Sequence, residues 1–124
     1  MARYTAREVQ RLLGDAGIVR HRGKIEAVIN NAQRACELVA QEGSLPAFIW
    51  RFEPDPMAPD APQTRSTSPE SVALSKELKQ RGWKFVGPTT VYAFMQSMGL
   101  VNDHVPGCAM RERVAKARLA FARP

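Results

Sequence analysis

Apolar residues recur at intervals of three and four along most of the chain, which is the spacing of amphipathic helices. The first such run, Val9, Leu12 and Leu13, follows a threonine and a glutamate that are spaced as a capping box, Thr5 and Glu8. A second run extends over about residues 23–42 and ends before a glycine. Its apolar positions are Ile25, Val28, Ile29, Ala32, Cys36 and Val39. The pattern predicts two amphipathic helices whose apolar side chains, the Cys36 thiol included, are buried.

The next segment contains a short apolar run and then many prolines. Ser44 is placed to cap a short helix that carries Phe48, Ile49 and Trp50. Prolines follow at positions 54, 56, 59 and 62, and each of them fixes φ and removes a backbone donor. We therefore expect residues 53–68 to form an exposed, proline-rich loop inside the domain.

Helical signals return after this loop. Ser68, Pro69 and Glu70 combine a cap residue, a first-position proline and an acid, so they predict the start of a helix that Gly82 ends. Pro88 opens the next helix. The core sides of these two helices carry Leu74 and Leu78, and then Val91, Phe94, Met95 and Met98. A basic helix over residues 109–122 follows. No segment is a convincing strand, and the chain is predicted to be an all-α helical bundle with one domain, residues 1–124.

Composition narrows the class of protein. A hydrophobic content of 44% is ordinary for a globular chain and too high for a disordered one. No apolar run approaches the roughly 18 residues that a membrane span needs, and the first residues lack a signal-peptide pattern. Two cysteines do not form a disulfide framework. We therefore expect a cytoplasmic protein with no membrane partner and no nucleotide cofactor.

The positive charge is unevenly distributed. The net charge is +6, and residues 76–124 account for all of it, with nine Lys or Arg against Glu77, Asp103 and Glu112. A one-sided excess of this kind is typical of a protein that binds a polyanion such as nucleic acid. A solvated basic surface is the alternative.

The joint between the two helices around Gly82 and Pro88 is the most informative stretch. A glycine at each end permits a left-handed helix exit and a close backbone approach. The new helix then offers unpaired N–H groups at its positive dipole end, which suit a DNA phosphate. The residues predicted to contact DNA are Gly82, Lys84, Val86, Gly87, Thr89 and Thr90. On these features alone, a helix corner that binds nothing remains an alternative.

Three stretches together resemble the type I DNA-3-methyladenine glycosylases. They are DAGIVRHRGKI at 15–25, LSKELKQRGWKFVG at 74–87 and FMQSMGLVNDH at 94–104. The resemblance implies a helix–hairpin–helix fold, binding of duplex DNA that contains alkylated adenine, and hydrolysis of the N-glycosidic bond of 3-methyladenine in base-excision repair. It also implies that His104 and Cys108 are zinc ligands. For Asp103, which directly precedes His104, a helix stop or a hydrogen bond to His104 is the plainer interpretation, and a catalytic role is the alternative.

The family's polypeptide is longer at its amino end. The resemblance places there the glutamate and aromatic residues that recognise the base, together with a cysteine and a histidine that complete a structural zinc site. We therefore expect a truncated glycosylase domain with half of a zinc site, and the catalytic residues of this chain itself remain unknown. The alternative function is a non-catalytic helix–hairpin–helix module that binds duplex DNA.

Overall fold

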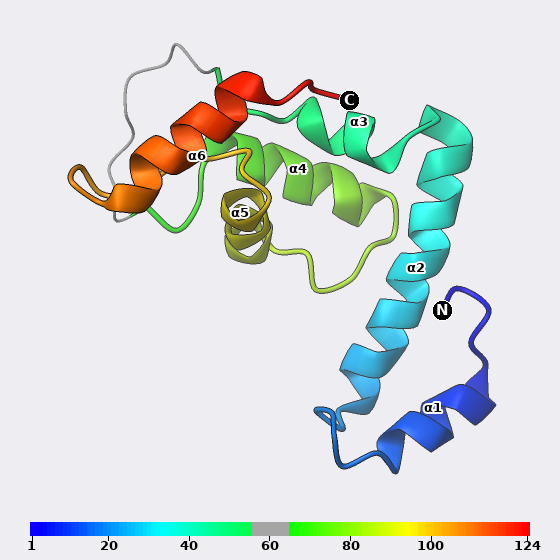
Figure 1. Cartoon of the computed structure of the whole chain (residues 1–124). Coiled ribbons are helices and arrows are strands. Elements are labelled where there is room, and N and C mark those ends of the chain that lie inside the picture. The colour runs from blue at the N-terminus through cyan, green and yellow to red at the C-terminus, as the bar shows by residue number, and fades with distance from the viewer. Residues whose placement is uncertain (56–64) are drawn as a thin grey trace. The chain divides into compact units, whose positions relative to one another are not determined.

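The computed structural model describes residues 1–55 and 65–124, and its regular elements are all helices (Figure 1). The helices are α1 (Ala6–Leu13), α2 (Arg22–Glu42), α3 (Leu45–Trp50), α4 (Pro69–Gln80), α5 (Pro88–Ser97) and α6 (Ala109–Ala120). The described ranges contain no strand, so the predicted all-α class is confirmed. No helix among these residues is long and apolar enough to cross a membrane.

The described residues divide into two compact units. One unit contains Met1–Leu45 and Glu77–Val86, and the other contains Pro46–Lys76 and Gly87–Pro124. The expectation of one domain over 1–124 stays a prediction. Of the predicted loop 53–68, residues 56–64 lie outside the described ranges, and the flanking residues 53–55 and 65–68 are not helical.

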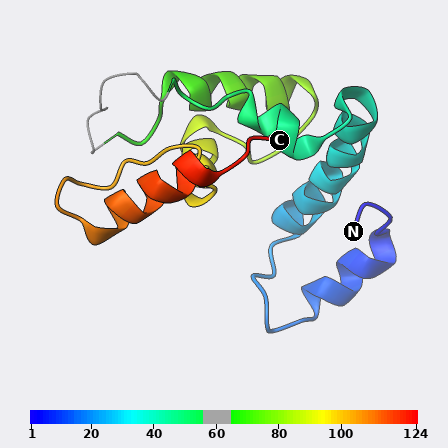
Figure 2. The same ribbon diagram turned by 45° about the horizontal axis from the view of Figure 1, so that its top comes forward.

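Helices α1 and α2 form the small core of the first unit. Val9 packs with Ile25 and Ile29, and these three side chains are at most 9% exposed. The predicted capping box is present at the start of α1: the Glu8 carboxylate accepts from the Thr5 backbone N–H at 2.7 Å. Hydrogen bonds from Thr5 lower the pKa of Glu8 to about 2. In Figure 2 the short α1 lies beside the amino-terminal half of α2.

The burial pattern of α2 differs from the prediction. Ile25 and Ile29 are buried as expected, but Val28, Cys36 and Val39 are exposed. The prediction for these three was wrong because apolar spacing identifies the apolar sides of a helix without saying which of them a neighbour covers. Helix α1 has only eight residues and covers one of these sides.

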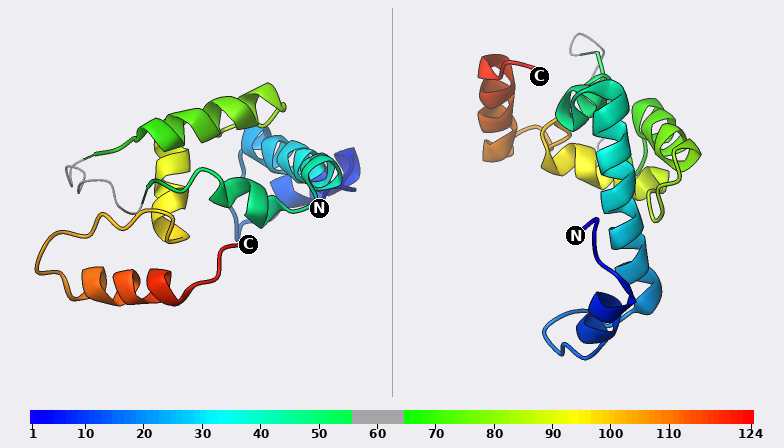
Figure 3. Two further views of the ribbon diagram at one scale, coloured as in Figure 1. Left: turned by 90° about the horizontal axis from the view of Figure 1, so that it is seen from above. Right: turned by 90° about the vertical axis from the view of Figure 1, so that its right-hand side faces the viewer.

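The second unit has its most deeply buried side chains on and around α4 and α5. Leu74, Met95 and Leu100 are at most 1% exposed. Ser68 caps α4 as predicted, because its hydroxyl accepts from the Ser71 N–H at 3.1 Å. Ser71 returns the contact by accepting from the Ser68 N–H at 2.8 Å, which closes a reciprocal cap. Figure 3 shows α5 running across α4.

The buried side of α5 is rotated about the helix axis relative to the predicted side. Val91 and Met95 are buried as expected, but Phe94 and Met98 are 39% and 56% exposed. Tyr92 is buried instead, with 2% exposed, and its hydroxyl donates to the Asp103 carboxylate at 2.8 Å. A satisfied hydroxyl makes burial of the tyrosine ring favourable, and apolar spacing alone does not reveal such a partner.

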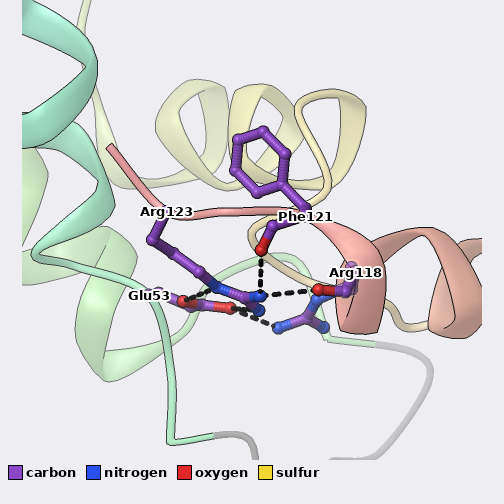
Figure 4. A network of polar contacts seen from close by, with 4 residues as sticks. All are labelled: Glu53, Arg118, Phe121 and Arg123. Carbon is purple, nitrogen blue, oxygen red and sulfur yellow. Dashed lines mark hydrogen bonds and ion pairs between the residues drawn. The ribbon is translucent and has the colours of Figure 1, made fainter.

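The chain end folds back onto the segment after α3 through a charged cluster (Figure 4). The Glu53 carboxylate accepts from the guanidinium groups of Arg118 at 2.9 Å and of Arg123 at 2.7 Å. The Arg123 guanidinium also lies over the Trp50 ring, 5.7 Å from its centroid, and the Phe121 ring lies 4.9 Å from that of Trp50. Helix α6 has no buried residue, so these polar and aromatic contacts hold the end of the chain to the segment after α3.

Candidate nucleic-acid interface

The exit of α4 has the geometry that the first glycine of the joint predicted. Gly82 has φ +86°, its N–H donates to Lys79, and the Trp83 N–H donates back to Leu78 at 3.0 Å. These two bonds form a Schellman motif, which satisfies the last carbonyls of the helix. An added Cβ at Gly82 would also lie 3.3 Å from Arg34. The fold itself therefore requires this glycine.

Two asparagines of α2 hold the residues that follow Gly82. The Asn30 amide donates to the Gly82 carbonyl at 2.9 Å. Asn31 makes two bonds to one residue: its amide donates to the Lys84 carbonyl at 2.8 Å, and its oxygen accepts from the Lys84 N–H at 2.9 Å. We call these contacts the asparagine clamp. They fix the backbone of the joint to the long helix of the same unit.

The clamp corrects one part of the predicted phosphate site. Because the Lys84 backbone N–H is bonded to Asn31, only the exposed ammonium side chain of Lys84 is available to a ligand. Val86 is half-buried and interacts within the chain. Phe85, which lies between them, has φ +57° and is 62% exposed. A left-handed backbone is rare for an aromatic residue and costs on the order of 1 kcal/mol or more, so the clamped joint holds a strained, outward-facing residue.

The second part of the predicted site is the start of α5, in the other unit. Gly87 is the N-cap residue, and no side chain caps the helix there. The first bond of the helical ladder runs from the Val91 N–H to the Gly87 carbonyl at 2.9 Å, so the amides of Thr89 and Thr90 precede it. Both threonines are exposed. This end of α5 therefore has the uncapped donors and exposed hydroxyls that the sequence predicted.

Nothing in the described fold requires glycine at position 87. Its φ of −62° is accessible to any residue, and an added Cβ would have no neighbour within 4 Å. No other described part of the chain therefore makes the close approach to the Gly87 backbone that was predicted.

Several of the basic residues behind the charge asymmetry are paired. Arg81 donates to Glu42 at 2.7 Å and to Glu77 at 3.0 Å, and these bonds raise the pKa of Arg81 above its ordinary value. Arg118 and Arg123 share Glu53. The expected basic tail is thus partly neutralised, whereas Lys79 and Lys84 beside the joint are exposed.

The two predicted zinc ligands lie near each other in the second unit. His104 and Cys108 line one surface pocket together with Asp103. The Asp103 carboxylate accepts from Tyr92 at 2.8 Å and from Gln96 at 2.6 Å. The expected hydrogen bond between Asp103 and His104 is not among these contacts. Within the described residues, no group of three or more His, Cys, Asp or Glu could hold a metal ion. The role of His104 and Cys108 as zinc ligands therefore stays a prediction.

A sequence profile described as methyladenine glycosylase matches residues 1–112. The chain belongs to the methyladenine glycosylase family. It is 48% identical over 105 residues to DNA-3-methyladenine glycosylase 1 of Escherichia coli, and 42% identical over 112 residues to DNA-3-methyladenine glycosylase of Haemophilus influenzae. These alignments cover 82% and 87% of this chain but 56% and 60% of the relatives.

Solved structures of family members agree with this assignment. A crystal structure of 3-methyladenine DNA glycosylase I superimposes with a TM-score of 0.76 at 47% identity, covering 87% of this chain and 62% of the other. A Staphylococcus aureus structure that describes 3-methyladenine recognition gives 0.79 at 34% identity, covering 89% and 61%. The chain thus spans about three-fifths of the relatives that it matches.

Sequence reasoning missed the residues that hold the joint. Asn30 and Asn31 form an adjacent polar pair within the apolar pattern of α2, and that interruption was the available signal. It also missed the role of His21, whose Nδ1 accepts from the Lys24 N–H at 3.1 Å and caps α2. His21, which belongs to the family-like stretch 15–25, thereby has a structural role.

Proposed function

We propose that this chain carries the DNA-holding part of a DNA-3-methyladenine glycosylase, which hydrolyses the N-glycosidic bond of 3-methyladenine in alkylated DNA and so begins base-excision repair. The observation that carries this proposal is the family match over residues 1–112, together with 42–48% identity to relatives named for that activity. The uncapped start of α5 and the exposed Lys84, Thr89 and Thr90 support a share in binding DNA.

The reaction needs little chemistry from the protein. Methylation at N3 gives the adenine a positive charge, so the base is already a good leaving group. The enzyme must turn the nucleotide out of the helix, hold the cationic base and admit water. Aromatic rings favour the cation over neutral adenine. In our proposal this base-binding step belongs to the part of the family's fold that the chain does not match.

The contribution of this chain is a grip on the sugar-phosphate backbone. We propose that the joint is a helix–hairpin–helix, in which the amides of Gly87, Thr89 and Thr90 and the two threonine hydroxyls bind a phosphate. Lys84, three residues earlier in the chain, adds an exposed positive charge. Such contacts read no base sequence, which suits a protein that scans any duplex.

A non-catalytic module for duplex DNA is the second candidate. The observation that favours it is coverage, because the chain spans only 56–62% of the relatives. Both candidates predict binding to duplex DNA, and they differ only in release of the damaged base.

Two measurements test the proposal. Fluorescence anisotropy with a labelled duplex at low and moderate salt should show binding that weakens as salt rises, since phosphate contacts release counterions. Absent or salt-insensitive binding would contradict both candidates. Release of 3-methyladenine from alkylated DNA then separates them. We expect little release by the chain alone and release when the remainder of the fold is supplied; DNA binding without release in both conditions would favour the non-catalytic module.

We also propose that His104 and Cys108 contribute two ligands to a structural zinc site. A histidine nitrogen and a thiolate are ligands that zinc prefers, and a zinc ion would tie the 104–108 loop to the residues that complete the site. Two further ligands must come from outside the described residues. Zinc content should therefore be low in the chain alone, and in the reconstituted fold it should fall when Cys108 is replaced by serine.

A further inference from the structure

The connection between α1 and α2 exposes two apolar side chains. Ile18 and Val19 are 40% and 75% exposed, and among the described large apolar residues only Leu119 is more exposed than Val19. A single exposed apolar side chain is ordinary on a protein surface. This pair is different because a run of basic residues follows it directly, at positions 20, 22 and 24. We call residues 18–24 the entry segment.

Hydrogen bonds hold the entry segment in a fixed shape. The His21 N–H donates to the Val19 carbonyl at 3.0 Å, and the His21 ring accepts from the Lys24 N–H at 3.1 Å. Just before the segment, the Gly17 N–H donates to the Asp15 carboxylate at 2.8 Å. A preorganised loop loses little conformational entropy when it binds, so this connection suits a contact surface.

Two cations of the entry segment have no role in the described fold. Arg20 and Lys24 are exposed, and within the part of the chain that the structure describes neither side chain has an ion-pair partner. Arg22 differs from them, since its guanidinium lies 3.7 Å from the Glu26 carboxylate. The Arg20 guanidinium and the Lys24 ammonium are therefore available to a ligand.

Helix α2 connects the entry segment to the clamped joint within one unit (Figure 1). Lys24 and Asn31 are seven positions apart, or about two turns, so they lie on one side of the helix about 10 Å from each other. Asn31 holds the backbone of Lys84, whose side chain is also exposed. A DNA duplex carries one phosphate per about 1.7 Å of its axis, so a span of about 10 Å faces several phosphates. The cations at the two ends of this span suit one duplex.

We propose that the entry segment is a second DNA contact of this chain, in which Arg20 and Lys24 bind phosphates and Val19 enters a groove as an apolar wedge between bases. Proteins that unstack a duplex insert apolar side chains between base steps and hold the backbone with cations. Turning a nucleotide out of the helix leaves a gap in the stack, and an apolar side chain fills such a gap favourably. This inference rests on the proposed function and adds a contact outside the joint.

The double variant Arg20→Gln and Lys24→Gln tests the phosphate contacts. Affinity of residues 1–124 for a labelled duplex is measured by fluorescence anisotropy over a series of salt concentrations. Each lost phosphate contact lowers the slope of log affinity against log salt by about one, so the double variant should lower it by about two. Affinity at low salt should fall about tenfold or more. Thermal unfolding should stay as in the parent, because both side chains are exposed.

Arg3→Gln with Arg7→Gln is the matched control. It removes the same charge from exposed positions of the same unit, at the amino-terminal end of α1, whose other end leads to the entry segment. The control should leave the salt slope close to that of the parent. Equal reductions in the control and in the entry-segment variant would reveal a general effect of charge and overturn the proposal. A parental salt slope in the entry-segment variant would overturn it as well.

Val19→Ser tests the wedge separately, because it changes no charge. The probes are an intact duplex and the same duplex with one abasic site, where the missing base already leaves a gap. The parent should bind the abasic duplex several-fold more tightly, and Val19→Ser should bring this ratio close to one without altering the salt slope. Equal affinity of the parent for the two duplexes would overturn the wedge, and so would an unchanged ratio in Val19→Ser.

Failure of this inference and failure of the proposed function give different results. If the parent shows no salt-dependent binding to either duplex, the proposed function fails and the entry segment has no DNA to contact. If the parent binds and all entry-segment variants behave like it, the inference is overturned while the proposed function stands.

Discussion

Removal of the Asn31 side chain is the most direct test of how the joint is held. Asn31→Ala eliminates both hydrogen bonds to Lys84, at 2.8 and 2.9 Å, while the helix position accepts alanine readily. A net contribution of about 0.5–1.5 kcal/mol per bond gives about 1–3 kcal/mol for the pair. Both bonds are exposed, so water replaces them in part, and we expect about 1–2 kcal/mol.

The expected loss of free energy concerns the opening of the joint and not the unfolding of the whole unit, so the assay must report on individual amides of the joint. A loss of 1–2 kcal/mol increases the population of the open joint by a factor of about 5–30. Hydrogen exchange at the Lys84 amide should accelerate by that factor, because the amide is protected by Asn31. If Lys84 contacts DNA as proposed, affinity for duplex DNA should fall as well, since the Lys84 backbone is no longer fixed to α2.

Two variants of the same pair of asparagines sharpen the test. Asn30→Ala removes the bond to the Gly82 carbonyl but leaves both bonds to Lys84, so Lys84 exchange should change little. Asn31→Asp keeps an acceptor for the Lys84 N–H but places a carboxylate against the Lys84 carbonyl, and it should behave like alanine. If the Lys84 amide in Asn31→Ala exchanges as slowly as in the parent, the asparagine clamp does not hold the joint.

Three further predictions concern the tail, the start of α5 and the buried tyrosine. Glu53→Gln should destabilise the second unit by about 1–2 kcal/mol at neutral pH. This free energy lies between the values for exposed and for buried ion pairs, because the Glu53 side chain is 13% exposed. Hydrogen bonds from Arg123 lower the pKa of Glu53 in the folded protein. The stability that the ionised Glu53 contributes is therefore complete above the pKa of the unfolded state and is lost as pH falls through the pKa of the folded state. The free energies of unfolding of parent and variant, measured with urea, should converge in acid. Gly87→Ala should lower thermal stability slightly, because glycine is preferred over alanine at an N-cap, and it should weaken DNA binding; unchanged affinity would count against the phosphate site. Burial and the bond to Asp103 raise the pKa of Tyr92 to about 12, so ultraviolet titration should show a late tyrosine that Tyr92→Phe removes, and stability should decline as pH rises from about 10 to 12.

Local sequence signals predicted the helices well. Thr5 and Glu8, Ser68 and Pro69, and Gly82 each begin or end a helix as expected, because caps depend on residues only a few positions apart. The sides of α2 and α5 that are buried were not predictable in the same way. They depend on which neighbour covers each side, and the Tyr92 hydroxyl found its partner 11 residues away.

The candidate site was predictable only in part for the same reason. The glycine exit and the uncapped start of α5 follow from residues within the joint. The asparagine clamp joins residues 52 and 53 positions apart, and the Glu53 cluster joins residues 65 and 70 positions apart. No local pattern pairs such distant residues. Counting charges therefore overstated the free basic surface, because it assigned no partner to Arg118 or Arg123.

The two glycines of the joint differ in a way that bears on function. Gly82 is explained by the fold, since its φ of +86° and the Arg34 side chain both disfavour a Cβ. Gly87 has neither reason, because its backbone is ordinary and the space around it is open. A residue without a side chain at an uncapped helix start, next to exposed threonines, admits a ligand to the backbone amides. Glycine is also preferred over alanine at an N-cap, so a helix corner that binds nothing would keep it too, and the affinity of Gly87→Ala for duplex DNA is the measurement that separates the two interpretations.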